Sequence, residues 1–260
     1  MTLTMRIQLY LVGATMVPLS LALSGCHATA NIMNRQTSFV MALLDVSATT
    51  KTARTSYLHD LATIMDQLQS GDTLWADQIT ENSLATSHIP FRLTLPVFNL
   101  LSTNADDYNS RLIALKKKAS ADAESLLNRE TKRTTLLDSL LVAQKVFHSS
   151  HALTAAHRVL VVFSDMREDS VRYVFDRENL TPARIKQIIG REQTDHRIPD
   201  LKGVQVYVAG AAADRSGNPE RIRQIEAFWR AYFRAAGTEL PDEHYSASLL
   251  DFTLPGSVQK

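Results

Sequence analysis

Oxygen-bearing side chains at alternate positions of one short segment have the types and the spacing that a hard cation requires. Residues 45–49 read Asp-Val-Ser-Ala-Thr, which puts one carboxylate and two hydroxyls on a turn. Ser164-Asp165 offers a second carboxylate, and Thr134-Thr135 offers hydroxyls at the start of a predicted helix. Mg²⁺ prefers such oxygen ligands in near-octahedral geometry. These residues therefore predict a divalent-cation site.

Uninterrupted apolar runs predict the strands that must position these residues. Residues 39–45, 157–165 and 204–210 have the pattern of strands buried on both faces, as in a parallel sheet. Helical patterns lie between the strands along most of the chain, which predicts one doubly wound, mostly parallel α/β sheet flanked by helices. Such sheets bind ligands at the carboxyl ends of their strands, here residues 45–49, 164–169 and 211–214.

Turn and cap signals predict the remaining elements. They predict a helix over residues 58–68 closed by Gly71, a strand over 72–80 and an edge strand over 91–96. Helical sequence follows over 105–149, with a break at 128–134. Further helices begin at Pro182 and Pro219, and a last strand lies within 245–252.

At the cation-binding residues the sequence resembles the von Willebrand factor A domain with its metal-ion-dependent adhesion site. That site uses Asp-x-Ser-x-Ser after the first strand, a Thr before a middle helix and an Asp after the fourth strand. Asp45 and Ser47 match directly, and Thr49 stands in place of the second Ser. The resemblance covers residues 38–252 and implies a site for Mg²⁺, or another divalent cation such as Mn²⁺. Its ligands would be Asp45, Ser47, Thr49, Thr134 and Asp165.

Two residues and one segment depart from that family pattern. Thr49 keeps the hydroxyl but adds a methyl group, and Met166 stands where the family often has Gly, which predicts a reshaped loop. The helical sequence over 105–130 exceeds what the minimal fold needs, so we expect an insertion beside the metal face.

The amino terminus has the order of an export signal. Residues 7–23 form a mainly apolar run without charge, preceded by Arg6. The run ends in Leu-Ser-Gly-Cys at 23–26, which resembles the lipobox of bacterial lipoproteins, whose cysteine is lipidated. An uncleaved transmembrane anchor is the alternative, although the run is short for a span.

This resemblance divides the chain into three parts. It implies a signal peptide over 1–25, a lipid anchor at Cys26 with a tether over 26–38, and a von Willebrand factor A-like domain over 39–254. By the same resemblance, His27 rather than Asp after the cysteine favours the outer membrane of a Gram-negative bacterium, with the domain facing the periplasm.

Composition excludes several other classes of protein. The chain has 260 residues with 28 basic and 27 acidic side chains, so its net charge of +1 gives no overall attraction to nucleic acid. This length, with 45% hydrophobic residues, supports one large globular domain or at most two small ones. The single cysteine excludes an internal disulfide, and no Walker loop, Gly-x-Ser-x-Gly elbow or Gly-rich dinucleotide turn is present.

Five further clusters favour structural interpretations. His148, His151 and His157 lie close together in sequence, and the first two suit a helix end better than a zinc site. The lysines at 116–118 suit a solvated helix face. The aromatic stripe within 222–233 indicates core packing. The acid pairs at 106–107 and 168–169 are expected at the surface.

Three hypotheses about function follow. The first is a non-enzymatic, lipid-anchored envelope protein that uses the cation to grip an acidic group of a partner protein. The second is a scaffolding lipoprotein of a secretion or conjugation assembly, in which residues 105–130 matter and the metal does not. The third is a metal-dependent hydrolase, which lacks an assigned general base.

Overall fold

The computed structural model of the chain describes residues 36–87, 89–99, 103–211, 218–250 and 252–257. The export signal and Cys26 lie outside these residues, as do 212–214 of the expected ligand-binding edge. Within the described ranges no helix has both the length and the apolar character needed to cross a bilayer.

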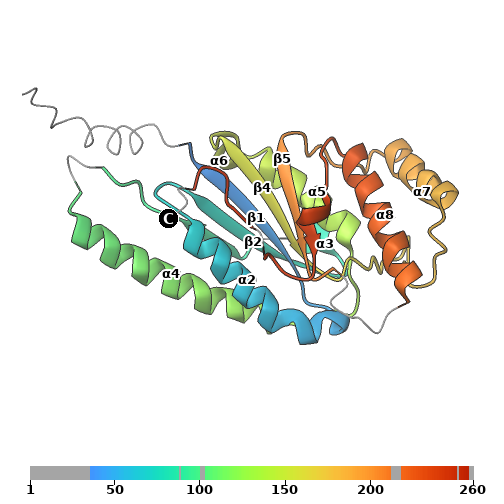
Figure 1. Cartoon of the computed structure of the whole chain (residues 1–260), viewed down its shortest axis with the longest axis horizontal. Coiled ribbons are helices and arrows are strands. Elements are labelled where there is room, and N and C mark those ends of the chain that lie inside the picture. Colours follow the sequence, from blue (N-terminus) through green and yellow to red (C-terminus); the bar gives the residue numbers. More distant parts are fainter. Residues whose placement is uncertain (1–35, 88, 100–102, 212–217, 251, 258–260) are drawn as a thin grey trace, which may run out of the picture. The chain divides into compact units, whose positions relative to one another are not determined.

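In the described part of the chain, six strands form one sheet in the order β3-β2-β1-β4-β5-β6, and β3 alone is antiparallel to its neighbour. The central strands β2, β1, β4 and β5 can be followed in Figure 1. The strands are β1 (Ser38–Asp45), β2 (Thr73–Ile79), β3 (Phe91–Thr94), β4 (His157–Phe163), β5 (Val204–Ala209) and β6 (Tyr245–Ser246). All eight residues of β1 are buried, as its apolar sequence predicts for a central strand covered on both faces. The predicted mostly parallel α/β sheet is confirmed.

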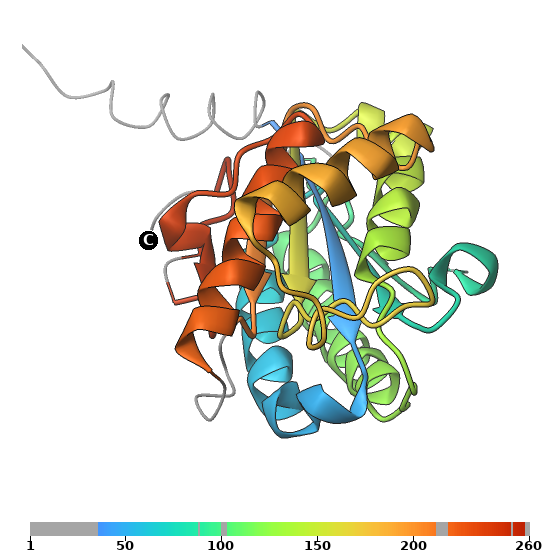
Figure 2. The same ribbon diagram turned by 90° about the vertical axis from the view of Figure 1, so that its right-hand side faces the viewer.

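Helices cover both faces of this sheet, each with its own apolar core (Figures 1 and 2). One face packs against α2 (Arg54–Gln67) and α4 (Ala105–Leu127). The other packs against α5 (Leu136–Phe147), α7 (Pro182–Thr194) and α8 (Pro219–Ala235). Short helices complete the fold: η1 (Ala48–Ala53), α3 (Ser83–Thr86), α6 (Ser150–Leu153) and η2 (Asp242–His244).

The helix starts follow the caps that the sequence indicates. Thr181 and Asn218 accept backbone N–H groups from the first turns of α7 and α8, each of which begins with proline. The aromatic stripe of α8 is core, because Phe228, Trp229 and Tyr232 are fully buried.

Several boundaries differ from the sequence-based expectations. Helix α2 ends at Gln67, and Gly71 instead takes φ +81° in the turn before β2. The last strand is only Tyr245–Ser246, because the chain then turns to pack along α2, where Phe252 O accepts a hydrogen bond from Gln67. Strand β1 begins at Ser38, inside the range expected for the tether.

Helix α4 occupies the region of the expected insertion and lies along α2 (Figure 1). Its cap, Asn104, accepts hydrogen bonds from the N–H groups of Asp106 and Asp107. Four residues near its carboxyl end are buried, whereas most of its other side chains are exposed or half-buried. Helix α4 is therefore attached to the domain mainly at its carboxyl end.

Candidate metal centre

The predicted ligands meet at the point where the winding of the sheet changes direction. From β1 the chain proceeds outward to β2 and β3 and then returns to form β4 on the other side of β1. Asp45 is the last residue of β1, and Ser164 is the first residue after β4. Because Leu44 pairs with Phe163, these two polar side chains lie at the same level of the sheet edge. Open α/β sheets bind ligands at such a crevice.

Asp45 is fully buried and stands at the centre of a hydrogen-bonded cluster. Ser164 Oγ donates to its Oδ2 at 2.6 Å. The Ser47 backbone N–H donates to its Oδ1 at 2.9 Å, and Thr134 Oγ1 donates to the same atom at 3.4 Å. Burial raises the pKa of Asp45, although these hydrogen bonds oppose the rise.

Asp165 is joined to this cluster through hydroxyl groups. Ser47 Oγ and Thr49 Oγ1 lie 3.0 Å apart, and Thr49 in turn is close enough to Asp165 to lower the pKa of that carboxyl. The Arg167 backbone N–H donates to Asp165 Oδ1 at 3.1 Å. The structure thus brings all five sequence-predicted residues into one connected set, and the methyl group of Thr49 does not prevent its participation.

Among the residues that the structure describes, the two carboxylates of this set lack a full counter-charge. Burial first, and the nearby charge of Asp45 second, raise the pKa of Asp165 to about 6. Arg167 Nε lies 3.9 Å from Asp165 Oδ2, but the same guanidinium makes a closer pair with Asp176 at 2.8 Å. Within the described ranges Asp45 makes no ion pair. Charged carboxylates buried in this way are costly unless a cation accompanies them.

The donor set fits a hard divalent cation. Two carboxylates match the charge of such an ion, and the hydroxyls of Ser47, Thr49 and Thr134 add neutral oxygen ligands. The described part of the chain contains no group of three or more His, Cys, Asp or Glu side chains arranged to hold a metal. Zn²⁺ favours nitrogen and sulfur ligands, whereas these five side chains offer oxygen alone.

Arg54 ties the ligand loop to the carboxyl end of α4. Its Nη2 donates to Val46 O at 2.7 Å and to Ser47 O at 3.2 Å, while Nη1 donates to Leu127 O at 3.0 Å. Thr131 adds a second tie, because its N–H donates to Val46 O at 3.2 Å and it forms an isolated β-bridge with Ser47. The rigid guanidinium fork suits carbonyls that lie on two separate segments.

Met166 keeps the backbone conformation of the Gly that the resemblance expects there. Its φ is +64°, in the left-handed region that side chains other than Gly rarely adopt. The side chain is fully buried, and the Met166 carbonyl accepts a hydrogen bond from Trp229 Nε1 at 2.8 Å. Core packing therefore holds the loop in a glycine-like conformation, and Asp165 stays within the cluster despite the substitution.

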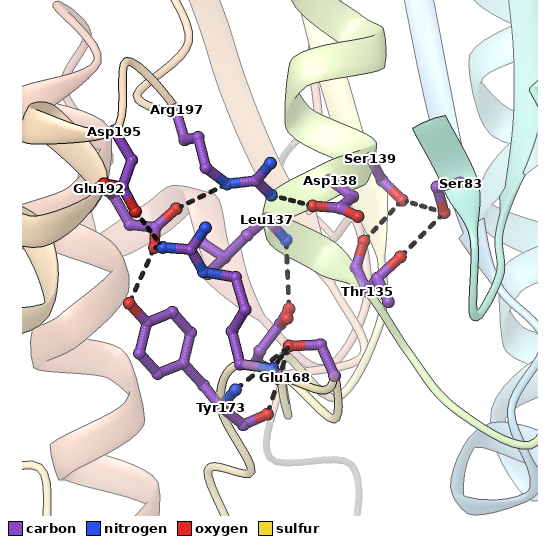
Figure 3. A network of polar contacts seen from close by, with 12 residues as sticks. Ser83, Thr135, Leu137, Asp138, Ser139, Glu168, Tyr173, Glu192, Asp195 and Arg197 are labelled. Atoms are coloured by element: carbon purple, nitrogen blue, oxygen red, sulfur yellow. Dashed lines mark hydrogen bonds and ion pairs between the residues drawn. The ribbon is translucent and has the colours of Figure 1, made fainter. Parts of the chain in front are cut away.

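Glu168 contradicts the expectation that the acid pair at 168–169 lies at the surface. The side chain is buried and accepts a hydrogen bond at 3.1 Å from Leu137 N–H in the first turn of α5 (Figure 3). Burial raises its pKa to about 8. Because Asp169 N–H donates to Thr134 O at 2.9 Å, the loop that buries Glu168 also holds the segment that supplies Thr134.

A second buried acid, Glu192, is fully paired and joins α7 to the same region. Tyr173 Oη donates to it at 2.8 Å, and Arg172 and Arg197 form ion pairs with it at 3.0 and 3.1 Å (Figure 3). Arg197 also pairs with Asp138 in the first turn of α5. This network fixes the start of α5, and hence Thr134, against α7.

The hydroxyl of Tyr57 lies near the carboxylates and, among the described residues, has no hydrogen-bond partner. Burial raises its pKa far above the usual value, and the charges of Asp45 and Asp165 add to the rise. Gly210 makes room for it, because a Cβ at that position would lie 2.4 Å from Tyr57 Oη and 2.9 Å from Ser164 O. With φ at +100°, this position requires Gly in both backbone conformation and space.

Three residues of this region were not among the predicted metal ligands: Ser164, Arg54 and Glu168. Ser164 had a usable signal, since it directly follows an apolar strand and precedes a predicted ligand. Arg54 and Glu168 had none, because one bonds backbone carbonyls and the other is buried by a loop without periodicity.

No protein-family model matches the chain, and no curated protein matches it in sequence. Solved structures are similar in fold. The manganese-loaded TRAP protein of Plasmodium vivax has a TM-score of 0.42 at 14% identity, over 82% of this chain and 69% of that protein. A von Willebrand factor type A structure from Catenulispora acidiphila has a TM-score of 0.36 at 13% identity, over 79% of this chain and 44% of that protein. The pilus adhesin SpaC of Lactobacillus rhamnosus GG has a TM-score of 0.42 at 8% identity, over 82% of this chain and 28% of that protein.

The chain thus spans less than half the length of the second and third of these proteins. The similarities concern the arrangement of helices and strands alone.

Proposed function

We propose that this chain is a non-enzymatic binding protein that uses a divalent cation to grip an Asp or Glu carboxylate of a partner protein. The observation that carries the proposal is the meeting of Asp45 and Asp165 at the sheet edge with three hydroxyls and, in the part of the chain that the structure describes, no adequate counter-charge. Mg²⁺, or another divalent cation such as Mn²⁺, would supply that charge.

Each residue of the cluster has a distinct part in this function. Asp45 and Asp165 provide the negative charge, while Ser47, Thr49 and Thr134 provide neutral oxygens. Asp45 is held from two strands by Ser164 and Ser47, so its carboxylate is oriented before any ion arrives. The bound ion supplies Lewis acidity toward an incoming carboxylate. Thr49 is exposed, which indicates the side from which a partner approaches.

Two measurements on the full chain test this function. Isothermal titration calorimetry with Mg²⁺ should show binding by the wild type and none by Asp45→Ala. An affinity pull-down from envelope extract should capture a partner with Mg²⁺, and chelation should release it. Asp66→Ala, which removes an exposed acid of α2, is the matched control and should behave as the wild type. Partner binding that survives both Asp45→Ala and chelation contradicts the proposal.

The proposed setting is the periplasmic face of an outer membrane, with Cys26 as the lipid anchor. The support is the sequence of residues 7–26, which has the order of a lipoprotein signal. Cys26→Ser should release the protein from the membrane fraction and abolish incorporation of labelled fatty acid. A variant that stays in the membrane fraction would show that the apolar run itself is the anchor.

A second function, scaffolding within a multi-protein envelope assembly, is favoured by helix α4. The helix has 23 residues, and Ile113 on its outer side is 69% exposed. If α4 is the assembly surface, Ile113→Glu should abolish assembly while Asp45→Ala leaves it intact. The reverse pattern supports the cation bridge.

A further inference from the structure

We infer that the cation site selects a partner segment carrying several Asp or Glu residues, because unpaired cationic side chains rim the site. The basic rim consists of Lys51, Arg129, Lys132 and Arg133. The inference rests on the proposed function, since the carboxylate bound to the cation sets where the rest of the acidic segment lies.

The rim residues flank two of the segments that supply ligands. Lys51 follows Thr49 by two residues, within η1. Lys132 and Arg133 directly precede Thr134. The β-bridge between Thr131 and Ser47 lays this basic segment against the ligand loop. The cationic side chains therefore belong to the same sheet edge as the cluster.

All four rim side chains are available to a partner. Each is exposed, and within the described ranges none of them forms an ion pair. Glu130 is the single acid in the segment from 129 to 133. On the far side of Asp165 the situation is different, because Arg167 is engaged by Asp176. The four unpaired rim cations thus lie on the side of Ser47 and Thr134.

The charges of the site and rim favour a ligand with more than one carboxylate. Asp45 and Asp165 already match a divalent ion, so one partner carboxylate completes the ion's shell without compensating the rim. Further carboxylates on the same peptide can reach the rim cations, since alternate residues of an extended segment lie about 7 Å apart on one side. Exposed pairs of this kind contribute modestly and are screened by salt.

The test compares two peptides on the full-length protein in the presence of Mg²⁺. Both are nine residues long, acetylated and amidated; one has a single central Glu among Gly and Ser, and the other has five Glu. Competition against the fluorescently labelled five-Glu peptide gives both affinities. At about 50 mM NaCl we expect the five-Glu peptide to bind about tenfold tighter or more. At about 500 mM NaCl that preference should largely disappear.

Charge-reversal variants test whether the preference for the five-Glu peptide arises from the rim residues. Lys132→Glu with Arg133→Glu should reduce it below about threefold while leaving Mg²⁺ binding measurable. The matched control is Lys117→Glu with Lys118→Glu, which makes the same change in net charge at exposed positions in the middle of α4. The control should keep the preference.

Three results would overturn the inference. They are equal affinity for the two peptides, equal loss of preference in the rim variant and the control, and binding of a DNA oligonucleotide of similar charge as tightly as the five-Glu peptide. A different result would show that the proposed function itself is wrong. In that case chelation and Asp45→Ala leave the binding of the single-Glu peptide unchanged, whatever the rim variant does.

Discussion

Replacing Glu168 by Gln should remove a pH dependence from the stability of the fold. Gln keeps the shape of the protonated acid and an oxygen that can accept from Leu137 N–H, but it cannot ionise. Burial raises the pKa of Glu168 from 4.5 to about 8. The folded protein therefore holds a proton that the unfolded chain releases above about pH 4.5, so wild-type stability falls as the pH rises through this window.

The size of the effect follows from the pKa shift. At about 1.4 kcal/mol per pKa unit, the difference in unfolding free energy between Glu168→Gln and the wild type should grow by up to about 5 kcal/mol between pH 4.5 and pH 9. Urea unfolding at a series of pH values, in chelator and at constant ionic strength, measures it. Glu130→Gln, at an exposed position, is the control. A difference that stays constant, or that grows toward acid pH, refutes the burial of an ionisable Glu168.

Three other substitutions test the site from different directions. Mg²⁺ at about 100 times its dissociation constant should stabilise the wild type by about 2.7 kcal/mol and leave Asp45→Ala unchanged, which thermal unfolding measures; stabilisation of both would place the ion elsewhere. Arg54→Ala should cost about 2 kcal/mol and speed hydrogen exchange at the Thr131 amide, because three carbonyls lose a charged donor. Tyr57→Phe should stabilise the fold by about 1 kcal/mol in urea unfolding, since it removes a buried hydroxyl without a partner; destabilisation would reveal a partner for that hydroxyl.

The sheet and its ligand edge are predictable because their signals are local. Apolar runs end at Asp45 and just before Ser164, and parallel strands place those ends side by side. Thr134 required the family resemblance, since Thr135 follows it and offers the same hydroxyl. In the structure Thr135 instead donates to Thr80 O at 2.7 Å, away from Asp45. Only packing of the start of α5 distinguishes these neighbours.

The failures of prediction have a common physical origin. Glu168 is polar in sequence and buried in the fold, because the loop after β4 folds back over the start of α5. Tyr245 begins a strand of only two residues, since the following segment leaves the sheet to pack on α2. Both outcomes depend on contacts between residues far apart in the chain, which no local pattern records.

The residues of the cluster are also far apart in sequence, and this separation has a kinetic consequence. Thr134 and Ser164 lie 89 and 119 residues from Asp45, so the cluster forms only after β1, β4 and the start of α5 have come together. Contacts between residues this far apart in sequence form slowly, so we expect the ligand set to be incomplete in the folding transition state. Mg²⁺ should therefore bind only after the transition state of folding has been passed. It should slow unfolding and leave the folding rate nearly unchanged.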